Sequence, residues 1–151
     1  MATVREGKNP PPYSAFNFVV TIDGDTIAAF QEVSGLDSEN TPIEYRTGAD
    51  PMNTDRKLPG KEKYPNCSLK RGITGSLYLW DWRKEVRDGA ATVPPTRNVT
   101  IELLNEQHVS VFKWKLTNAW CTKLGGPSLN AKGNEIAIET MELAYDRLDI
   151  E

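Results

Sequence analysis

The sequence predicts a mainly β domain, an antiparallel β-sandwich or barrel-like fold with one central α-helix. Three observations carry this prediction. Short stretches of alternating apolar and polar residues recur along the chain, turn-forming residues separate them, and only one stretch has helical spacing. A length of 151 residues corresponds to one domain. We therefore expect a flexible N-terminal arm over residues 1–12 and a single domain over residues 13–151.

The first strands follow an N-terminal stretch that ends in three prolines, which favour an extended backbone without hydrogen-bond donors. Apolar alternation over residues 16–22 predicts the first strand. An Asp-Gly-Asp turn then leads into a second strand over residues 26–33, so that the two form a hairpin. A third strand is expected over residues 41–47, where Pro42 indicates an edge strand or a bulge.

The middle of the chain contains the least regular segment and the single predicted helix. Residues 48–66 combine prolines, glycines and charged side chains without clear periodicity, and we expect a long loop. A strand over residues 67–74 follows it. Ser76 is then expected to cap a helix over residues 77–88, which stops at Gly89.

The second half of the chain alternates again. We expect strands over residues 98–104 and 109–116, followed by a long final strand over residues 135–149. The apolar residues of that last strand change parity part-way along it, which predicts a β-bulge near Thr140.

Composition excludes several functions. Eighteen basic residues against 21 acidic ones give a net charge of −3, which argues against specific nucleic-acid binding through a basic surface. No apolar run is long enough for a membrane span, and no secretory signal peptide is visible. A single histidine, His108, leaves little material for a metal site or a catalytic triad. We therefore expect no enzyme activity, no metal and no cofactor, and we expect Cys67 and Cys121 to be free and buried.

Other candidate sites have simpler explanations. His108 lies where a turn between two strands is expected, so we interpret it as a solvated turn residue. The tryptophans could line a sugar-binding platform, but their positions on apolar faces favour core packing. They are Trp80, Trp82, Trp114 and Trp120. The residues alone leave two functions open, a binding module or a self-assembling structural subunit.

Four blocks of the sequence resemble the tail tube proteins of contractile phages and of phage-tail-like contractile injection systems. The most specific is the C-terminal block GPSLNAKGNEIAIETMEL. In chain order, the blocks cover residues 13–22 with 30–36, 58–74, 79–82 and 126–143. Their order and spacing match the family from about Tyr13 to Leu148.

The resemblance implies a structural inner-tube subunit. Such subunits form hexameric rings, which stack into a hollow tube inside a contractile sheath. The implied partners are copies of the chain itself, the sheath protein, baseplate and tube-initiator proteins, a terminator or cap protein, and cargo in the lumen. Assembly in the cytoplasm would precede incorporation into a particle or virion tail. The Lys-Tyr-Pro-Asn and Gly-Asn-Glu-Ile-Ala-Ile-Glu-Thr segments favour an injection system. The alternatives are a phage tail tube that passes DNA and a monomeric carbohydrate-binding β-sandwich.

The resemblance also suggests where contacts between subunits form. We expect the 48–66 segment to reach a neighbouring subunit or ring through charged and aromatic side chains. These are Asp50, Asp55, Arg56, Lys57, Lys61, Lys63 and Tyr64. Glu135 and Glu139 are placed as possible lumen-facing residues. Six copies of a chain with net charge −3 would carry about −18 per ring, and a negative lumen would repel DNA and acidic cargo.

Overall fold

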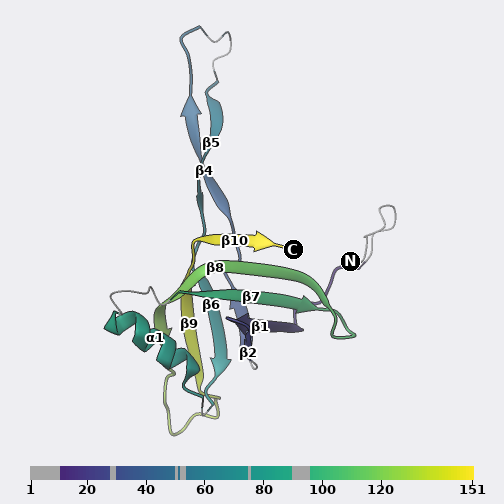
Figure 1. Cartoon of the computed structure of the whole chain (residues 1–151), viewed down its shortest axis with the longest axis vertical. Coiled ribbons are helices and arrows are strands. Elements are labelled where there is room, and N and C mark those ends of the chain that lie inside the picture. The colour runs from purple at the N-terminus through teal and green to yellow at the C-terminus, as the bar shows by residue number, and fades with distance from the viewer. Residues whose placement is uncertain (1–10, 28–29, 50, 52–53, 75, 90–95) are drawn as a thin grey trace.

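A computed structural model describes residues 11–151 except 28–29, 50, 52–53, 75 and 90–95. The described chain forms ten strands and one helix (Figure 1). The elements are β1 (Phe18–Ile22), β2 (Asp25–Ile27), β3 (Phe30–Ser34), β4 (Glu39–Tyr45), β5 (Arg56–Lys63), β6 (Cys67–Gly72), α1 (Tyr78–Asp88), β7 (Arg97–Leu104), β8 (Ser110–Gly125), β9 (Ile138–Ala144) and β10 (Arg147–Ile150). The mainly β, antiparallel fold with one helix is confirmed.

The body of the molecule is one bent sheet with strand order β2-β1-β7-β8-β9-β6-β3, and β10 pairs with β8 off this path. The 16-residue β8 belongs to both halves. Its first part pairs with β7 and β10, and residues 120–125 pair with β9. We call the half made of β3, β6, β9 and residues 120–125 the axial sheet, because β6 and β9 run along the longest axis in Figure 1. The other half, which runs across that axis, is the transverse sheet.

A single hydrophobic core lies between the two sheets and α1. Strand β6 shows the pattern that builds it, since Cys67, Leu69 and Arg71 are buried and alternate with partly exposed neighbours. Strand β9 contributes Met141 and Leu143 in the same way. The buried apolar set is Val20, Ile22, Cys67, Leu69, Leu79, Trp82, Val99, Ile101, Leu116, Ala119, Cys121, Met141, Leu143 and Tyr145.

Helix α1 packs against β8 and closes this core. Leu79 and Trp82 are buried on its inner face, and Gly89 ends it in the left-handed conformation with φ 57°, as predicted. The predicted Ser76 cap is wrong by one position. Leu77 occupies the N-cap without a side-chain hydrogen bond, although the Tyr78 N–H donates to the Ser76 Oγ at 3.4 Å. At 11 residues, this only helix of the described chain is too short and too polar to cross a membrane.

Arg97 at the start of β7 joins the helix to the transverse sheet. Its guanidinium lies 5.1 Å from the ring centre of Tyr78 and 5.2 Å from that of Trp82. The same group also pairs with the Glu85 carboxylate at 3.1 Å. These contacts come from three positions on α1 and fix the rotation of the helix about its own axis.

Several predicted strand boundaries are wrong. The strand expected over residues 26–33 is two strands, because β2 pairs with β1 in the transverse sheet and β3 pairs with β6 in the axial sheet. The final strand is divided into β9 and β10 around Asp146. The register is continuous at Thr140, so the predicted bulge is absent there. The parity change arises because Ile136 and Ile138 lie outside the core and are 72% and 36% exposed.

Two predictions about single side chains have different outcomes. Cys67 and Cys121 are free and buried, as predicted. Both pair in register with Leu143, which lies between them, so their Cα atoms are two strand spacings or roughly 10 Å apart, too far for a disulfide. The prediction that all tryptophans lie in the core is wrong, because Trp80 is 43% and Trp120 38% exposed.

Candidate functional site

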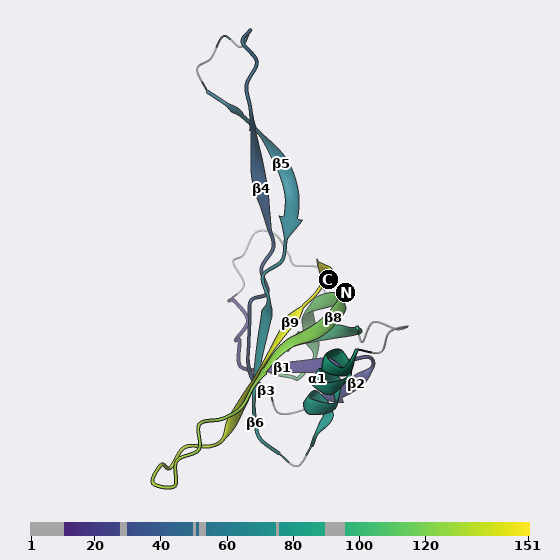
Figure 2. The same ribbon diagram turned by 90° about the vertical axis from the view of Figure 1, so that its left-hand side faces the viewer.

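A two-stranded hairpin projects from the body along the long axis of the molecule (Figures 1 and 2). It consists of β4 and β5, which pair only with each other in the described chain. Every residue of β4 is exposed, and so is every residue of β5 except Gly60. The expectation of a long loop over residues 48–66 is therefore wrong, because residues 56–63 form a strand that extends the predicted third strand into a ribbon.

One face of this hairpin, which we call its apolar face, carries three apolar side chains together with Arg56, which lies opposite Tyr45. Ile43 lies directly opposite Leu58, and Tyr45 lies two residues along on the same face. Their side chains are 54%, 49% and 49% exposed. The opposite face pairs Glu44 with Lys57. An isolated two-stranded ribbon is marginally stable in water, and uncovered apolar side chains at such a site usually mark a surface that binds a partner.

Close backbone packing near the base of the ribbon depends on a glycine. A Cβ atom on Gly60 would lie 2.1 Å from the Thr41 carbonyl oxygen. This distance is too short for any residue with a side chain. The register shifts at this point, between Asn40 and Pro42, and the Asn40 side-chain amide donates to the Gly60 carbonyl at 3.1 Å. This bulge gives the ribbon a fixed twist as it leaves the body.

The root of the hairpin is attached to the core by two tyrosines. The rings of Tyr64 and Tyr145 lie 5.7 Å apart, and the Tyr145 hydroxyl donates to the Gly35 carbonyl at 3.3 Å. Burial raises the pKa of Tyr145 to about 12. Gly35 has φ 83°, and a Cβ there would lie 2.3 Å from the Asn66 carbonyl oxygen. The two chain segments that enter the hairpin are therefore held against each other and against the body.

The axial sheet ends in two unpaired strand edges. Within the described residues, β3 pairs with β6 on one side and with no strand on the other. Residues 120–125 of β8 pair with β9, and beyond Ala119 no described strand pairs with their other edge. Exposed edges of this kind can add strands from another chain. The molecule therefore presents two free sheet edges that face sideways from its long axis, and one hairpin that projects along this axis.

Comparison with known proteins identifies the family of a chain with these features. A family model described as T4-like virus tail tube protein gp19 matches residues 14–149. The chain belongs to this tail tube family. No curated protein sequence matches it at a significant level.

Several solved structures are similar to this tail tube protein. One is a chain of the PVC sheath–tube complex, an extracellular contractile injection system in its extended state, with 30% identity, a TM-score of 0.80, and coverage of 93% of this chain and 91% of that one. Another belongs to the tube-terminating cap of the anti-feeding prophage, with 29% identity, a TM-score of 0.84, and coverage of 97% and 95%. Hcp1 from Flavobacterium johnsoniae shares the fold at 13% identity and a TM-score of 0.60, covering 88% and 93%.

Four of the seven residues predicted for contacts between subunits lie on one strand of the tail tube protein. Arg56, Lys57, Lys61 and Lys63 are exposed on β5, and Asp55 precedes it. Asp50 lies outside the described residues. Tyr64 is half-buried at the hairpin root, so it faces the body.

The sequence reasoning missed Ile43, Tyr45 and Leu58. The available signal was the spacing of Ile43 and Tyr45 within the predicted third strand. Leu58 could not be matched to them without the pairing register, which is a property of the folded hairpin.

The two glutamates predicted to face a lumen differ in environment. The Glu139 carboxylate accepts a hydrogen bond from Arg71 Nε, and Arg71 is only 4% exposed. Arg71 also donates from Nη2 to the Ser76 carbonyl at 3.1 Å, so the ion pair joins β6 and β9 to the start of α1. Glu135 precedes β9 and is exposed. Glu139 thus has an internal partner, whereas Glu135 is at the surface.

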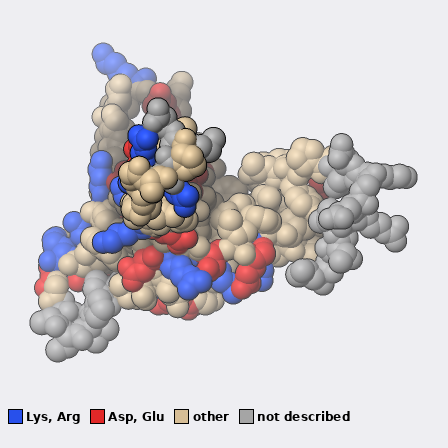
Figure 3. Space-filling model, turned by 90° about the horizontal axis from the view of Figure 1, so that it is seen from above, with Lys and Arg blue, Asp and Glu red and all other residues tan. Residues whose placement is uncertain are grey.

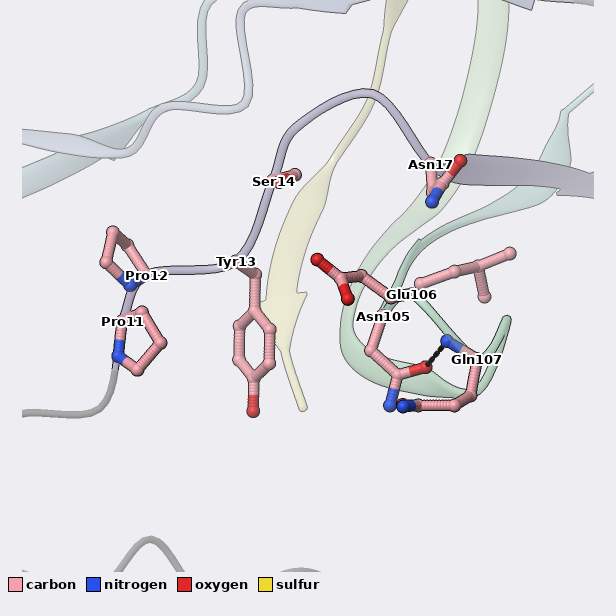
Figure 4. Close-up of a pocket in the computed structure, with 9 residues that line it drawn as sticks. Pro11, Pro12, Tyr13, Ser14, Asn17, Asn105, Glu106 and Gln107 are labelled. Carbon is pink, nitrogen blue, oxygen red and sulfur yellow. Dashed lines mark hydrogen bonds between the residues drawn. The ribbon is translucent and has the colours of Figure 1, made fainter.

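A groove beside the turn between β7 and β8 is lined by Tyr13, Asn17 and residues 104–107, and there the Asn105 Oδ1 accepts from the Gln107 N–H at 3.0 Å (Figure 4). His108 next to it is exposed in a turn with φ 61°, as predicted. The described residues contain no group of three possible metal ligands. Seen down the hairpin, acidic and basic side chains are interspersed (Figure 3).

Proposed function

We propose that this tail tube protein is a structural, non-catalytic subunit that forms hexameric rings and stacks them into a hollow tube inside a contractile sheath. The observation that carries the proposal is the projecting hairpin, whose apolar face nothing in the described chain covers. An isolated ribbon with uncovered apolar side chains is a surface that binds another chain, which fits a subunit completed by its neighbours better than a monomeric binding module.

Rings would form through the axial sheet. The free edge of β3 in one copy would pair with the free edge of residues 120–125 of β8 in the next, so that the sheets of six copies join into one barrel. Closing a sheet in this way removes the exposed edges that otherwise lead to aggregation. The strands of the axial sheet run along the long axis, so neighbours would add sideways.

Stacking would use the hairpin. Because the hairpin continues along the axis on which the axial strands lie, it extends out of its own ring toward the next one (Figure 2). The contact is head-to-tail, which produces an open filament. The apolar face would be covered by the neighbouring ring, and the charged side chains of β5 and Asp55 would form the polar rim of this interface. We propose that Asp50 also contributes to this polar rim.

The remaining partners follow from the relatives. Similar chains occur in a sheath–tube complex and in a tube-terminating cap. We propose that this chain likewise contacts a sheath, a baseplate with its tube initiator, and a terminator. It would assemble in the cytoplasm and then act as part of an extracellular particle. Two relatives of 29–30% identity belong to an extracellular contractile injection system, which favours that role over a phage tail tube that passes DNA. Neighbouring genes for a sheath and baseplate without capsid genes would support it, and adjacent capsid genes would support a phage.

Assembly of the full chain tests the proposal. The purified protein should form rings or tubes in negative-stain electron micrographs and sediment as large particles. A variant lacking residues 50–62, which removes seven of the eight residues of β5 and so abolishes the ribbon, should keep the fold of the body but lose the tubes. A chain that stays monomeric at high concentration, or a deletion variant that forms normal tubes, would contradict the proposal.

A further inference from the structure

One face of the axial sheet carries no covering element from the described chain. The opposite face contributes Cys67, Leu69 and Met141 to the core, beneath α1 and the transverse sheet. Because side chains alternate along a strand, the residues between these point the other way. Figure 2 views the sheet nearly edge-on, with α1, β1 and β2 all on one side of it. The other side is solvated.

Two rows of side chains on this bare face cross all four strands, and the apolar Ile138 and Trp120 lie on the same face outside these rows. Each row is a set of successive register partners, running from β3 through β6 and β9 to β8. The first row is Ser34, Ser68, Glu142 and Lys123. The second row is Glu32, Lys70, Thr140 and Gly125.

Charge is balanced within each row. In the second row the Lys70 Nζ lies 3.7 Å from the Glu32 Oε2. In the first row Lys123 lies directly opposite Glu142. Each row therefore holds one acid and one base, and its other positions are hydroxyl residues or glycine. Opposite charges on neighbouring strands attract one another, so little field extends away from this face.

We propose that this face is the wall of the tube lumen and that its row-by-row charge balance lets macromolecules of either charge pass without being held. The inference rests on the proposed tube. If axial sheets join edge to edge into a barrel, the side that carries α1 and the transverse sheet needs the larger circumference and must lie outside. The bare face then lies inside.

This assignment changes the expected electrostatics of the tube. The net charge of −3 per chain does not make the lumen acidic, because the four charged residues of the two rows sum to zero. Glu139 lies on the core side with Arg71, away from the wall. Glu135 precedes β9, so it can contribute only at a rim of the lumen. The occupant that fits the two charge-balanced rows is a hydrophilic polymer that must slide through.

Cysteine labelling tests the position of the wall. Ser68→Cys introduces a thiol on the bare face, and Lys84→Cys introduces one on the exposed face of α1; the native cysteines are buried. In sedimented tubes, a small maleimide should label both variants. A polyethylene-glycol maleimide too bulky for the lumen should label Lys84→Cys but not Ser68→Cys, although it labels both in unassembled protein. If Ser68→Cys does not assemble, Ser34→Cys in the same row replaces it.

Charged thiol reagents test the balance. In tubes of Ser68→Cys, the ratio of the reaction rates of cationic and anionic methanethiosulfonates should equal the ratio measured with 2-mercaptoethanol, a free thiol in solution. Adding Lys70→Gln leaves six uncompensated carboxylates per ring and should raise the cation-to-anion ratio roughly tenfold. Adding Lys84→Gln instead should leave the ratio unchanged.

The outcomes separate the two proposals. If the wild-type chain forms no tubes, the proposed function fails. If tubes form but the bulky maleimide labels Ser68→Cys as fast as Lys84→Cys, or the small maleimide does not label it at all, the bare face is not the wall. If the ratio of reagents at Ser68→Cys is already strongly biased before Lys70 is changed, the charge balance is wrong.

Discussion

The body and the hairpin use the same alternating pattern with opposite results. Along β6, every second side chain is buried, because α1 and the transverse sheet lie over it. Along β4, Ile43 and Tyr45 alternate with polar residues in the same way, yet all seven residues are exposed. The difference is the location of the covering surface, which for the body lies within the chain. For the hairpin no described element supplies it, and in the proposed tube it comes from another chain, so that stability and assembly would be encoded in separate regions.

The largest effect on stability should come from the core of the body. Trp82→Ala removes a fully buried ring from α1 and should lower the free energy of unfolding by about 3–5 kcal/mol. Urea unfolding of the unassembled chain measures the change. Trp80→Ala is the matched control on the exposed face of the same helix and should cost about 1 kcal/mol or less. Equal losses for both would show that α1 does not complete the core.

The second largest loss in the free energy of unfolding should come from breaking the buried ion pair between Arg71 and Glu139. Glu139→Gln leaves the Arg71 guanidinium buried without its carboxylate and should cost about 3 kcal/mol, the lower end for such pairs, because Glu139 keeps some exposure. Glu32→Gln removes the carboxylate of an exposed pair and should cost below about 1 kcal/mol. Urea unfolding compares the two. A negligible loss for Glu139→Gln would mean that water reaches Arg71 in solution.

Stability should also fall at high pH, again because of the body. Burial raises the pKa of Cys67 from 9.0 to about 12. Between these values the unfolded thiol is ionised and the folded thiol is not, so the unfolded state binds fewer protons and is favoured as pH rises. The group should cost about 1.4 kcal/mol per pH unit above pH 9. Cys67→Ala should make the pH dependence of unfolding shallower by that amount, and an unchanged slope would contradict the burial of this thiol.

These two regions also show how far sequence reasoning reached. The helix and its end at Gly89 were predictable, because Leu79, Trp82 and Val86 have helical spacing and glycine accepts the left-handed conformation. The division of β2 from β3 was not, because it depends on which distant strand each one meets. Residues 56–63 resembled a loop because their charges and proline are tolerated only where a strand has no covering layer within its own chain.

The candidate site was predictable only in part. The family resemblance located the segment that leaves the body, and four of its predicted charged residues lie on β5. The apolar pair of Ile43 and Leu58 could not be recognised, because it exists only once the strands are in register. The partner of Glu139 was missed for a similar reason, since Arg71 lies 68 residues away in the sequence and becomes its neighbour only when β6 pairs with β9.

The smallest effect on stability should accompany the largest effect on assembly, and this contrast tests the central claim most directly. Leu58→Asp places a charge on the apolar face of the hairpin, and Glu44→Thr changes the opposite face on the paired strand β4. Both should change the free energy of unfolding of the body by no more than about 0.5 kcal/mol. Negative-stain microscopy of equal concentrations should then show tubes for Glu44→Thr and none for Leu58→Asp. Normal tubes from a well-folded Leu58→Asp variant would contradict the account.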